Sequence, residues 1–284
     1  MIGTSGYSYA EWAESGFYPP ATPSGKMLPF YAQIFPITEL NYTWYQMPRA
    51  DAVERMRQQV TTAFYFAAKL NRSLTHEIDP HGWRGSVKQY RDGIAPLLLT
   101  GQLVAVLLQF PPSFHRTPPS RRYLAALLEA LEGLPAAVEF RHSSWATDRV
   151  FDELKHRKVT LVTVDGPDLP DLFPRLDVVT NSEFFYIRFH GRNAKGWRSG
   201  NMQKQFDYDY SDRELREWSG RFVPAMAKQA RKGFFFFNNH VRAQAPDNAL
   251  KLMNQLVAIG MLDLAPPRSN HGFSVTSRND ALFT

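Results

Sequence analysis

The sequence predicts a single (β/α)8 barrel, a TIM barrel, and three observations support this prediction. Strand-like and helix-like segments alternate along the chain, eight strand-like segments fit into 284 residues, and most of these segments carry polar side chains near their C-terminal ends. Alternating strands and helices indicate a parallel sheet, and eight such units in a chain of this length are typical of a closed barrel. We therefore expect residues 1–284 to form one domain.

The expected strands are residues 2–6, 37–45, 64–70, 103–110, 136–142, 159–165, 184–191 and 233–240. The expected helices are residues 26–35, 51–60, 87–99, 121–131, 148–157, 212–232 and 248–259. Ser211 and Glu214 have the spacing of a capping box, which predicts the start of the sixth of these helices. Residues 166–177 are rich in proline and predict a loop with at most a short helix.

The structural alternative is a doubly wound open sheet. Such a sheet usually begins with a glycine-rich turn that leads into a helix, and its strands are almost continuously Val and Ile. Here Gly3-Thr4-Ser5-Gly6 is not followed by a helix-forming segment, and the strands alternate in character. The barrel is therefore favoured.

The strand at residues 184–191 shows the alternation most clearly. One face is apolar and carries Phe185, Ile187 and Phe189. The other carries Tyr186, Arg188 and His190. In a barrel the first face packs under the helices, and the second faces the interior, with its chemistry at the C-terminal end.

The same period of two predicts further inward-facing polar residues near the C-terminal strand ends. They are Glu39, Asn41, Thr43 and Tyr45, then Lys69, Gln109, Glu139, Arg141, Thr163 and Asp165. For the last strand the alternation does not decide whether Asn238 or Asn239 faces inwards. Because active sites of such barrels lie at this end, these side chains are expected to share one pocket.

Composition narrows the chemistry. The chain has no cysteine, which excludes disulfides, thiolate nucleophiles and zinc–thiolate sites. Its apolar segments are short and interrupted, and its first residues lack the pattern of a secretory signal, so we expect a cytoplasmic protein without a membrane span. The net charge of +6 and the pI near 9.5 favour anionic partners, although simple solubility explains them equally well.

Three residues are the catalytic candidates. Glu139 and Asp165 end neighbouring strands, so they could form an acid–base pair or share a divalent cation with His190. The alternative is that Glu139 neutralises inward-facing arginines. No metal-binding or cofactor motif is present, so the sequence assigns no cofactor.

The expected substrate-binding residues are polar or aromatic and lie at strand ends. They are Asn41, Tyr45, Lys69, Gln109, Arg141, His142, Trp145, Arg188, Arg192, Asn238 and Asn239. Lys69 could form a Schiff base, hold a phosphate or make a salt bridge. Residues 191–206 are basic and lie beside Trp197, Tyr208 and Tyr210, a combination that predicts binding of phosphate or nucleic acid.

Several motifs in order carry a family resemblance. They are Ile2-Gly3-Thr4-Ser5-Gly6, Glu39-Leu40-Asn41, Gln109-Phe110-Pro111-Pro112, Glu139-Phe140-Arg141-His142, Arg188-Phe189-His190-Gly191 and Phe237-Asn238-Asn239. Together they resemble the YecE-like family over nearly the whole chain. The resemblance implies a TIM barrel and no settled activity, and the likeness of this family to endonuclease IV-like barrels suggests nucleic-acid binding by analogy of fold.

The function expected from the sequence is acid–base hydrolysis of a phosphate-bearing substrate such as a nucleotide or nucleic acid. In this interpretation Glu139 is the base, Asp165 or His190 is its partner, and cationic side chains hold the anion. One alternative is a non-catalytic module that binds nucleic acid or protein. The other is a sugar-phosphate enzyme.

Overall fold

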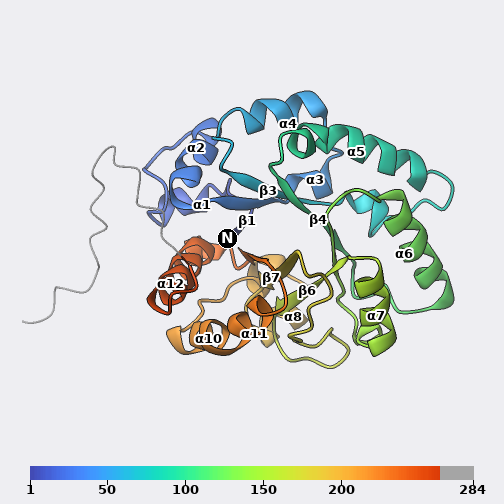
Figure 1. Cartoon of the computed structure of the whole chain (residues 1–284). Helices are drawn as coiled ribbons and strands as arrows, with labels where there is room; N and C mark the ends of the chain where they lie inside the picture. Colours follow the sequence, from blue (N-terminus) through green and yellow to red (C-terminus); the bar gives the residue numbers. More distant parts are fainter. Residues whose placement is uncertain (263–284) are drawn as a thin grey trace, which may run out of the picture.

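Eight parallel strands close into a barrel in the order of the chain, in a computed structural model that describes residues 1–262 (Figure 1). The strands are β1 Ile2–Ser5, β2 Ile37–Leu40, β3 Tyr65–Lys69, β4 Leu103–Gln109, β5 Ala136–Glu139, β6 Thr160–Asp165, β7 Phe184–Phe189 and β8 Lys232–Phe237. The predicted (β/α)8 barrel is confirmed. Of the single domain predicted for residues 1–284, residues 263–284 lie outside the described part.

The main helices lie around this barrel (Figure 1). They are α2 Ser24–Ile34, α4 Ala50–Arg57, α5 Trp83–Leu99, α6 Pro118–Ala130, α7 Asp148–His156, α10 Asp212–Glu217, α11 Val223–Ala227 and α12 Gln244–Ala258. Within residues 1–262 no helix combines the length and the apolar character needed to cross a lipid bilayer.

The strands bury two separate apolar layers. One layer fills the barrel and includes Ile37, Ala67, Leu107 and Phe236. The larger layer packs between the outer faces of the strands and the helices. Because successive side chains of a strand point to opposite sides, strands β2 to β8 each contribute to both layers. The polar residues discussed below interrupt the inner layer at its C-terminal end.

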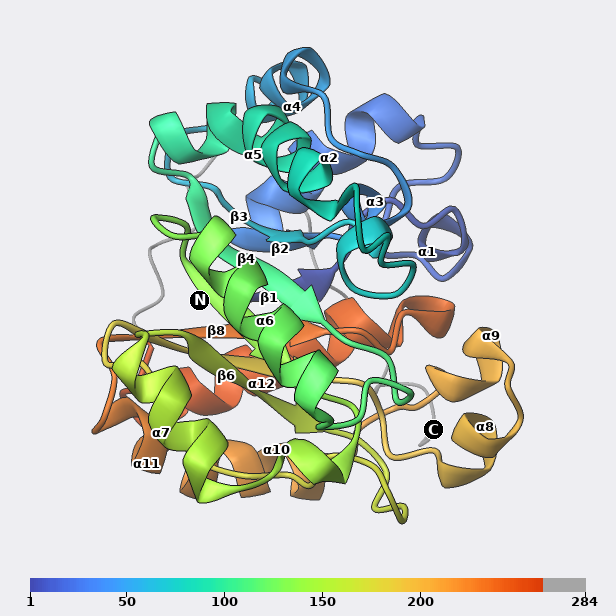
Figure 2. The same ribbon diagram turned by 90° about the vertical axis from the view of Figure 1, so that its right-hand side faces the viewer.

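Four short helices gather at the C-terminal end of the barrel. They are α1 Glu11–Glu14, α3 Tyr42–Tyr45, α8 Ala194–Arg198 and α9 Met202–Gln205. The side view places all four at the same end, on the right of Figure 2. They lengthen the loops that surround the mouth of the barrel, the place where TIM barrels build their active sites.

The predicted strand at residues 37–45 is only half strand. It ends at Leu40, and α3 takes up the remainder. The Thr43 hydroxyl donates to the carbonyl of Leu40 at 2.9 Å and lies 2.6 Å from the carbonyl of Lys69. These contacts satisfy carbonyls at the ends of β2 and β3 and favour the helical turn over a longer strand.

Two other segments bear on the site. The predicted capping box is confirmed at Ser211 and Glu214, but the helix that it starts is interrupted by a π-helical turn at Trp218–Phe222. Residues 166–183, between β6 and β7, contain no helix, which agrees with the loop predicted for residues 166–177. This segment forms a wall of the pocket described below.

Candidate active site at the barrel mouth

An arginine spans the interior of the barrel. Arg188, at the end of β7, is 1% exposed and donates from Nη1 to Glu139 Oε2 and from Nη2 to Glu39 Oε1, each at 2.7 Å. Glu39 also accepts a hydrogen bond of 2.6 Å from the Tyr186 hydroxyl. Buried charges are stable only when they are paired and hydrogen-bonded. Arg188 therefore connects β2, β5 and β7 across the barrel.

Glu139 is shared by three neighbours. Besides Arg188, it forms a salt bridge with the Arg141 Nε atom, and the His190 Nε2 atom lies 3.3 Å from its Oε1. Burial alone would raise the pKa of Glu139, but the charges of Arg141 and Arg188 outweigh burial and hold the pKa well below its usual value. Glu139 is therefore a permanent carboxylate and a weak base.

His190 is fully buried between Arg141 and Asn238. Its Nε2 lies 3.1 Å from Arg141 Nη2, and its Nδ1 lies 3.0 Å from the Asn238 amide nitrogen. Burial, reinforced by the charge of Arg141, lowers the pKa of His190 to about 3. The imidazole is thus neutral at physiological pH.

Lys69 differs from the two arginines. It ends β3, is partly buried, and its ammonium lies 4.8 Å from the ring centroid of Trp44. Burial, with the charge of Arg188, lowers the pKa of Lys69 to about 7. Within residues 1–262 no carboxylate lies within salt-bridge distance of its amine. Lys69 is therefore an unpaired group that titrates near neutral pH.

The inward positions at the strand ends form a ring at the mouth. In chain order they are Ser5, Asn41, Lys69, Gln109, Arg141, Val164, His190 and Asn238. Lys69, Gln109 and Arg141 follow one another on the three adjacent strands β3, β4 and β5. The ring is polar except at β6, where Val164 takes the inward place.

The sequence interpretation of β6 is wrong. Val162 and Val164 fill the barrel, and Asp165 faces outwards towards the helices. Asp165 accepts hydrogen bonds from Tyr210 at 2.8 Å, from Trp218 at 2.7 Å and from Arg192 at 2.7 Å. Because branched side chains fill barrel interiors, the apolar row of this strand was the inner one. Asp165 is a structural acceptor, and it does not meet Glu139 and His190 to form the trio considered as a metal site.

The same distinction separates the other predicted residues. Asn238 faces the mouth, whereas Asn239 faces outwards and donates to the Tyr208 carbonyl at 2.8 Å and to Asn248 Oδ1 at 2.7 Å. Arg192 also lies outside the barrel, where it pairs with Asp165 and Glu217. Neither Asn239 nor Arg192 belongs to the ring.

Three more predicted residues lie away from the ring. Tyr45 is 56% exposed on α3, because β2 ends before it. His142 caps a short turn, holds Ser144 and stacks on His115 at 3.8 Å. Trp145 is buried in the outer layer and donates to the Phe114 carbonyl at 2.7 Å. A position shortly after a strand in the sequence therefore does not place a side chain in the ring. Tyr45, His142 and Trp145 all come after the ends of β2 and β5.

The aromatic residues in and beside the loop after β7 are directed into the protein. Trp197 lies 5.1 Å from the Arg141 guanidinium and packs edge-on to His190. Tyr210 is buried against Asp165, and Tyr208 is hydrogen-bonded to Glu214. They do not form the exposed stacking surface that a nucleic-acid strand would use.

The sequence analysis missed some members of the site. Tyr186 has the same parity as Arg188, so its inward position could have been used to predict its contact with Glu39. Trp44 and His76 contact each other beside Lys69, with Trp44 Nε1 3.3 Å from His76 Nδ1. His76 comes from the loop after β3, and nothing in the sequence connects that loop with the mouth.

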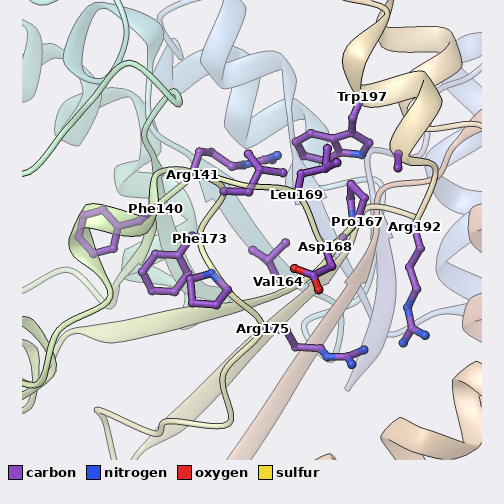
Figure 3. A pocket seen from close by; sticks show the side chains of 14 residues that line it. Phe140, Arg141, Val164, Pro167, Asp168, Leu169, Phe173, Arg175, Arg192 and Trp197 are labelled. Atoms are coloured by element: carbon purple, nitrogen blue, oxygen red, sulfur yellow. The ribbon is translucent and has the colours of Figure 1, made fainter.

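A pocket of about 530 Å³ opens beside the ring at β6 (Figure 3). It is lined by Arg141 and Trp197 and by residues of the segment after β6, among them Leu169, Leu172 and Phe173. Val164 lies between Arg141 and Arg175 in the close-up view. Among residues 1–262 no group of three or more His, Asp or Glu side chains is arranged to hold a metal ion.

Comparisons with other proteins agree with this architecture. A crystal structure of a DUF72 family protein from Thermotoga maritima is 32% identical, with a TM-score of 0.81 over 90% of this chain and 98% of that one. The UPF0759 protein YunF of Bacillus subtilis is 28% identical over 270 residues, 90% of this chain and 95% of YunF. The UPF0759 protein YecE of Escherichia coli K12 is 28% identical over 145 residues, 50% of this chain and 48% of YecE.

The family model described as "Protein of unknown function DUF72" matches residues 1–270, nearly the full chain. The resemblance to the YecE-like family is confirmed by this match and by the similarity to YecE and YunF. The chain therefore belongs to the DUF72 family.

Proposed function

We propose that the protein is an enzyme that binds a phosphate-bearing substrate at the mouth of the barrel and acts on it by acid–base hydrolysis. Lys69 and Arg141 hold the phosphate, and Gln109 orients it from the strand between them. As water attacks the phosphorus and the bond to the ester oxygen breaks, the protonated amine of Lys69 donates its proton to that leaving oxygen. The unpaired amine of Lys69 is the observation that supports this proposal most strongly.

A count of charges supports anion binding. Two guanidinium groups, on Arg188 and Arg141, are matched by the two buried carboxylates of Glu39 and Glu139. A protonated Lys69 is then in excess by one positive charge in a largely buried site. An anion placed beside it would supply the missing counter-charge, and phosphate is an anion that both Lys and Arg side chains commonly bind.

The titration of Lys69 supports proton transfer. A group whose pKa lies near the working pH exchanges protons most effectively in catalysis. Glu139 and His190 were the expected acid and base, but both have a pKa far below neutrality. In the proposed mechanism they position Arg141 and Arg188, and Lys69 takes the proton-transfer role.

Binding of sulfate, which stays doubly charged across the pH range, tests the anion site. Lys69→Met is expected to weaken sulfate binding about tenfold or more by calorimetry, since one full charge contact is lost. Lys155→Met is the matched control, because Lys155 is exposed on α7. Equal sulfate affinity of wild type and Lys69→Met would refute the proposal.

Lys69→Arg separates binding from proton transfer. Arginine keeps the positive charge but does not lose its proton in proteins, so sulfate binding is retained within a few-fold. With a panel of phosphate monoesters, turnover by this variant is expected to fall by about 100-fold or more. If turnover of every active ester survives in Lys69→Arg, the proton-transfer role is excluded.

The second candidate is binding of nucleic acid at the rim. Lys195, Arg198 and Lys204 on α8 and α9 are exposed beside the mouth. Such residues attract phosphate backbones without reading a sequence. The inward direction of Trp197 counts against a stacking mode, so this candidate depends on charge alone.

A further inference from the structure

The pocket beside β6 differs in chemistry from the rest of the mouth. Seven strands contribute a polar or charged residue to the ring, and β6 contributes Val164. The pocket opens at this interruption, and the apolar part of its lining includes Val164, Leu169, Leu172 and Phe173. Apolar surface at one side of a charged ring favours a ligand whose own surface is divided in the same way.

The pocket and the anion site share Arg141. Its guanidinium lines the pocket, while the same side chain pairs with Glu139 and lies within electrostatic reach of Lys69. Figure 3 shows Arg141 along one edge of the pocket, opposite Arg175 and next to Leu169. A phosphate on Lys69 and Arg141 would therefore lie at the entrance of the apolar space.

The pocket also carries two further arginines, which are paired, and Asp168, which forms no salt bridge within residues 1–262 and lies on the side of Arg175 and Arg192 (Figure 3). Arg175 and Arg192 both donate to Asp165, at 3.2 and 2.7 Å, and both lie near Glu217. They form the outer edge of the pocket without an excess charge of their own. The cationic group of the pocket that adjoins the proposed phosphate site is therefore Arg141, and the apolar part of the lining carries Val164, Leu169, Leu172 and Phe173.

Flat aromatic rings contribute to two sides of the pocket. The Trp197 indole lies against the Arg141 guanidinium, and the Phe173 ring lies across the pocket from Trp197 (Figure 3). Planar surfaces stack on planar ligands more closely than on branched ones. The volume of about 530 Å³ is large for phosphate alone and falls within the usual range for small-molecule sites.

From this arrangement we infer that the substrate is a phosphate-bearing compound with a flat, largely apolar ring, and that the ring occupies the pocket between Trp197 and the segment after β6. This inference rests on the proposed function, since it takes Lys69 and Arg141 as the phosphate site. Beyond the proposed function, the inference specifies the chemical class of the group attached to the phosphate.

Methyl phosphate and phenyl phosphate test the inference on the full chain by calorimetry. Phenyl phosphate is expected to bind about tenfold tighter or more, because its ring buries apolar surface that the methyl group lacks. Val164→Thr, which keeps the side-chain shape and replaces one methyl group by a hydroxyl, is expected to reduce this gain about threefold to tenfold. Leu169→Ser, in the loop, is expected to reduce it similarly and does not depend on the packing of β6.

The matched control is Val104→Thr. Val104 is also partly buried against the inner layer, but it lies near the start of β4, at the other end of the barrel. It is expected to leave the phenyl gain unchanged. The inference fails if phenyl phosphate binds no tighter than methyl phosphate, or if the gain persists in both Val164→Thr and Leu169→Ser.

The two proposals fail in different ways. If methyl phosphate binds, loses affinity in Lys69→Met and gains nothing from a ring, the pocket inference is overturned while the phosphate site is retained. If neither ester binds the wild-type chain, the phosphate site itself is refuted. If both bind and the ring gain vanishes only in the pocket variants, both are supported.

Discussion

At the scale of single residues, Lys69 is the group whose behaviour depends most on pH. Its pKa in the folded chain is about 7, below the usual value of 10.5. The charged form that holds an anion is therefore lost as the pH rises through 7. We expect sulfate affinity to fall between pH 6 and 8 in the wild type and to stay flat in Lys69→Arg, as measured by calorimetry.

The same shift makes stability depend on pH. Between 7 and 10.5 the unfolded chain binds a proton at Lys69 that the folded chain does not, so stability rises with pH in this window. The free energy of unfolding of the wild type relative to Lys69→Met should increase by about 1 kcal/mol per pH unit there. Below pH 7 the difference should be constant. Denaturant titrations at several pH values measure both ranges, and a slope of opposite sign would contradict the assignment.

Arg188 has a structural effect of a different kind. Arg188→Met leaves Glu39 and Glu139 buried with less compensation, which is expected to cost about 3 to 5 kcal/mol in the free energy of unfolding. Protonation of the two carboxyls should recover part of this loss as the pH falls towards 5. Arg231→Met, at a position whose side chain is 77% exposed, is the control and should change stability by about 0.5 kcal/mol or less. A small loss in Arg188→Met would show that the pairing is weak.

At the scale of elements, Asp165 connects β6 with the segment between α10 and α11. Asp165→Asn keeps the shape of the side chain but removes the charge that accepts hydrogen bonds from Arg192 and Trp218. We expect the free energy of unfolding to fall by about 2 to 4 kcal/mol. Hydrogen exchange should accelerate first in the π-helical turn. Asp152→Asn, at a position 74% exposed, should be neutral.

Asp165→Asn also tests whether the outward face of β6 takes part in ligand binding. Because Asp165 lies outside the ring, methyl phosphate binding by Asp165→Asn should change about twofold or less under conditions where the variant is folded. A loss of binding of about 100-fold in a folded variant would place Asp165 in the site after all.

The sequence predicted most inward faces correctly, and the exceptions have physical causes. Arg188, Lys69 and Glu139 lie on strands with one clearly apolar row, and that row packs under the helices. In β6 the apolar row fills the barrel instead, and the outward carboxylate is compensated by donors far away in sequence. Tyr45 was misplaced because hydrogen bonds of Thr43 favour a helical turn, a tertiary effect that alternation does not include.

At the scale of the whole molecule, the fold was predictable because eight local patterns agree with one closed sheet. The pocket could not be predicted, because it is formed by α8 and by the segment after β6, which are separate segments of the sequence. The sequence predicts that inward-facing charges pair with one another, since buried charges need partners. It does not predict which carboxylate pairs with which arginine. The unpaired state of Lys69 depends on which carboxylates the arginines occupy.

The net charge of +6 makes one prediction about the molecule as a whole. If the rim binds nucleic acid, changing Lys195, Arg198 and Lys204 together to Ala should reduce the slope of log affinity against log salt by about 2 to 3. Fluorescence anisotropy with a labelled single strand measures this slope. Changing Lys26, Lys88 and Lys228 instead removes the same total charge from other parts of the chain and serves as the control. Equal slopes for the two triple variants would mean that the rim is not a nucleic-acid site.

The ion pairs of Arg188 with Glu39 and Glu139 across the barrel have a consequence for biosynthesis. The ribosome makes Glu39 and Glu139 well before Arg188, so a nascent chain that ends before β7 holds two acids destined for the interior without the cation that they share. Partial barrels of this kind gain little from burying those strands, and stable closure waits until the last quarter of the chain emerges. Truncated products should accordingly remain open to proteases rather than persist as folded fragments.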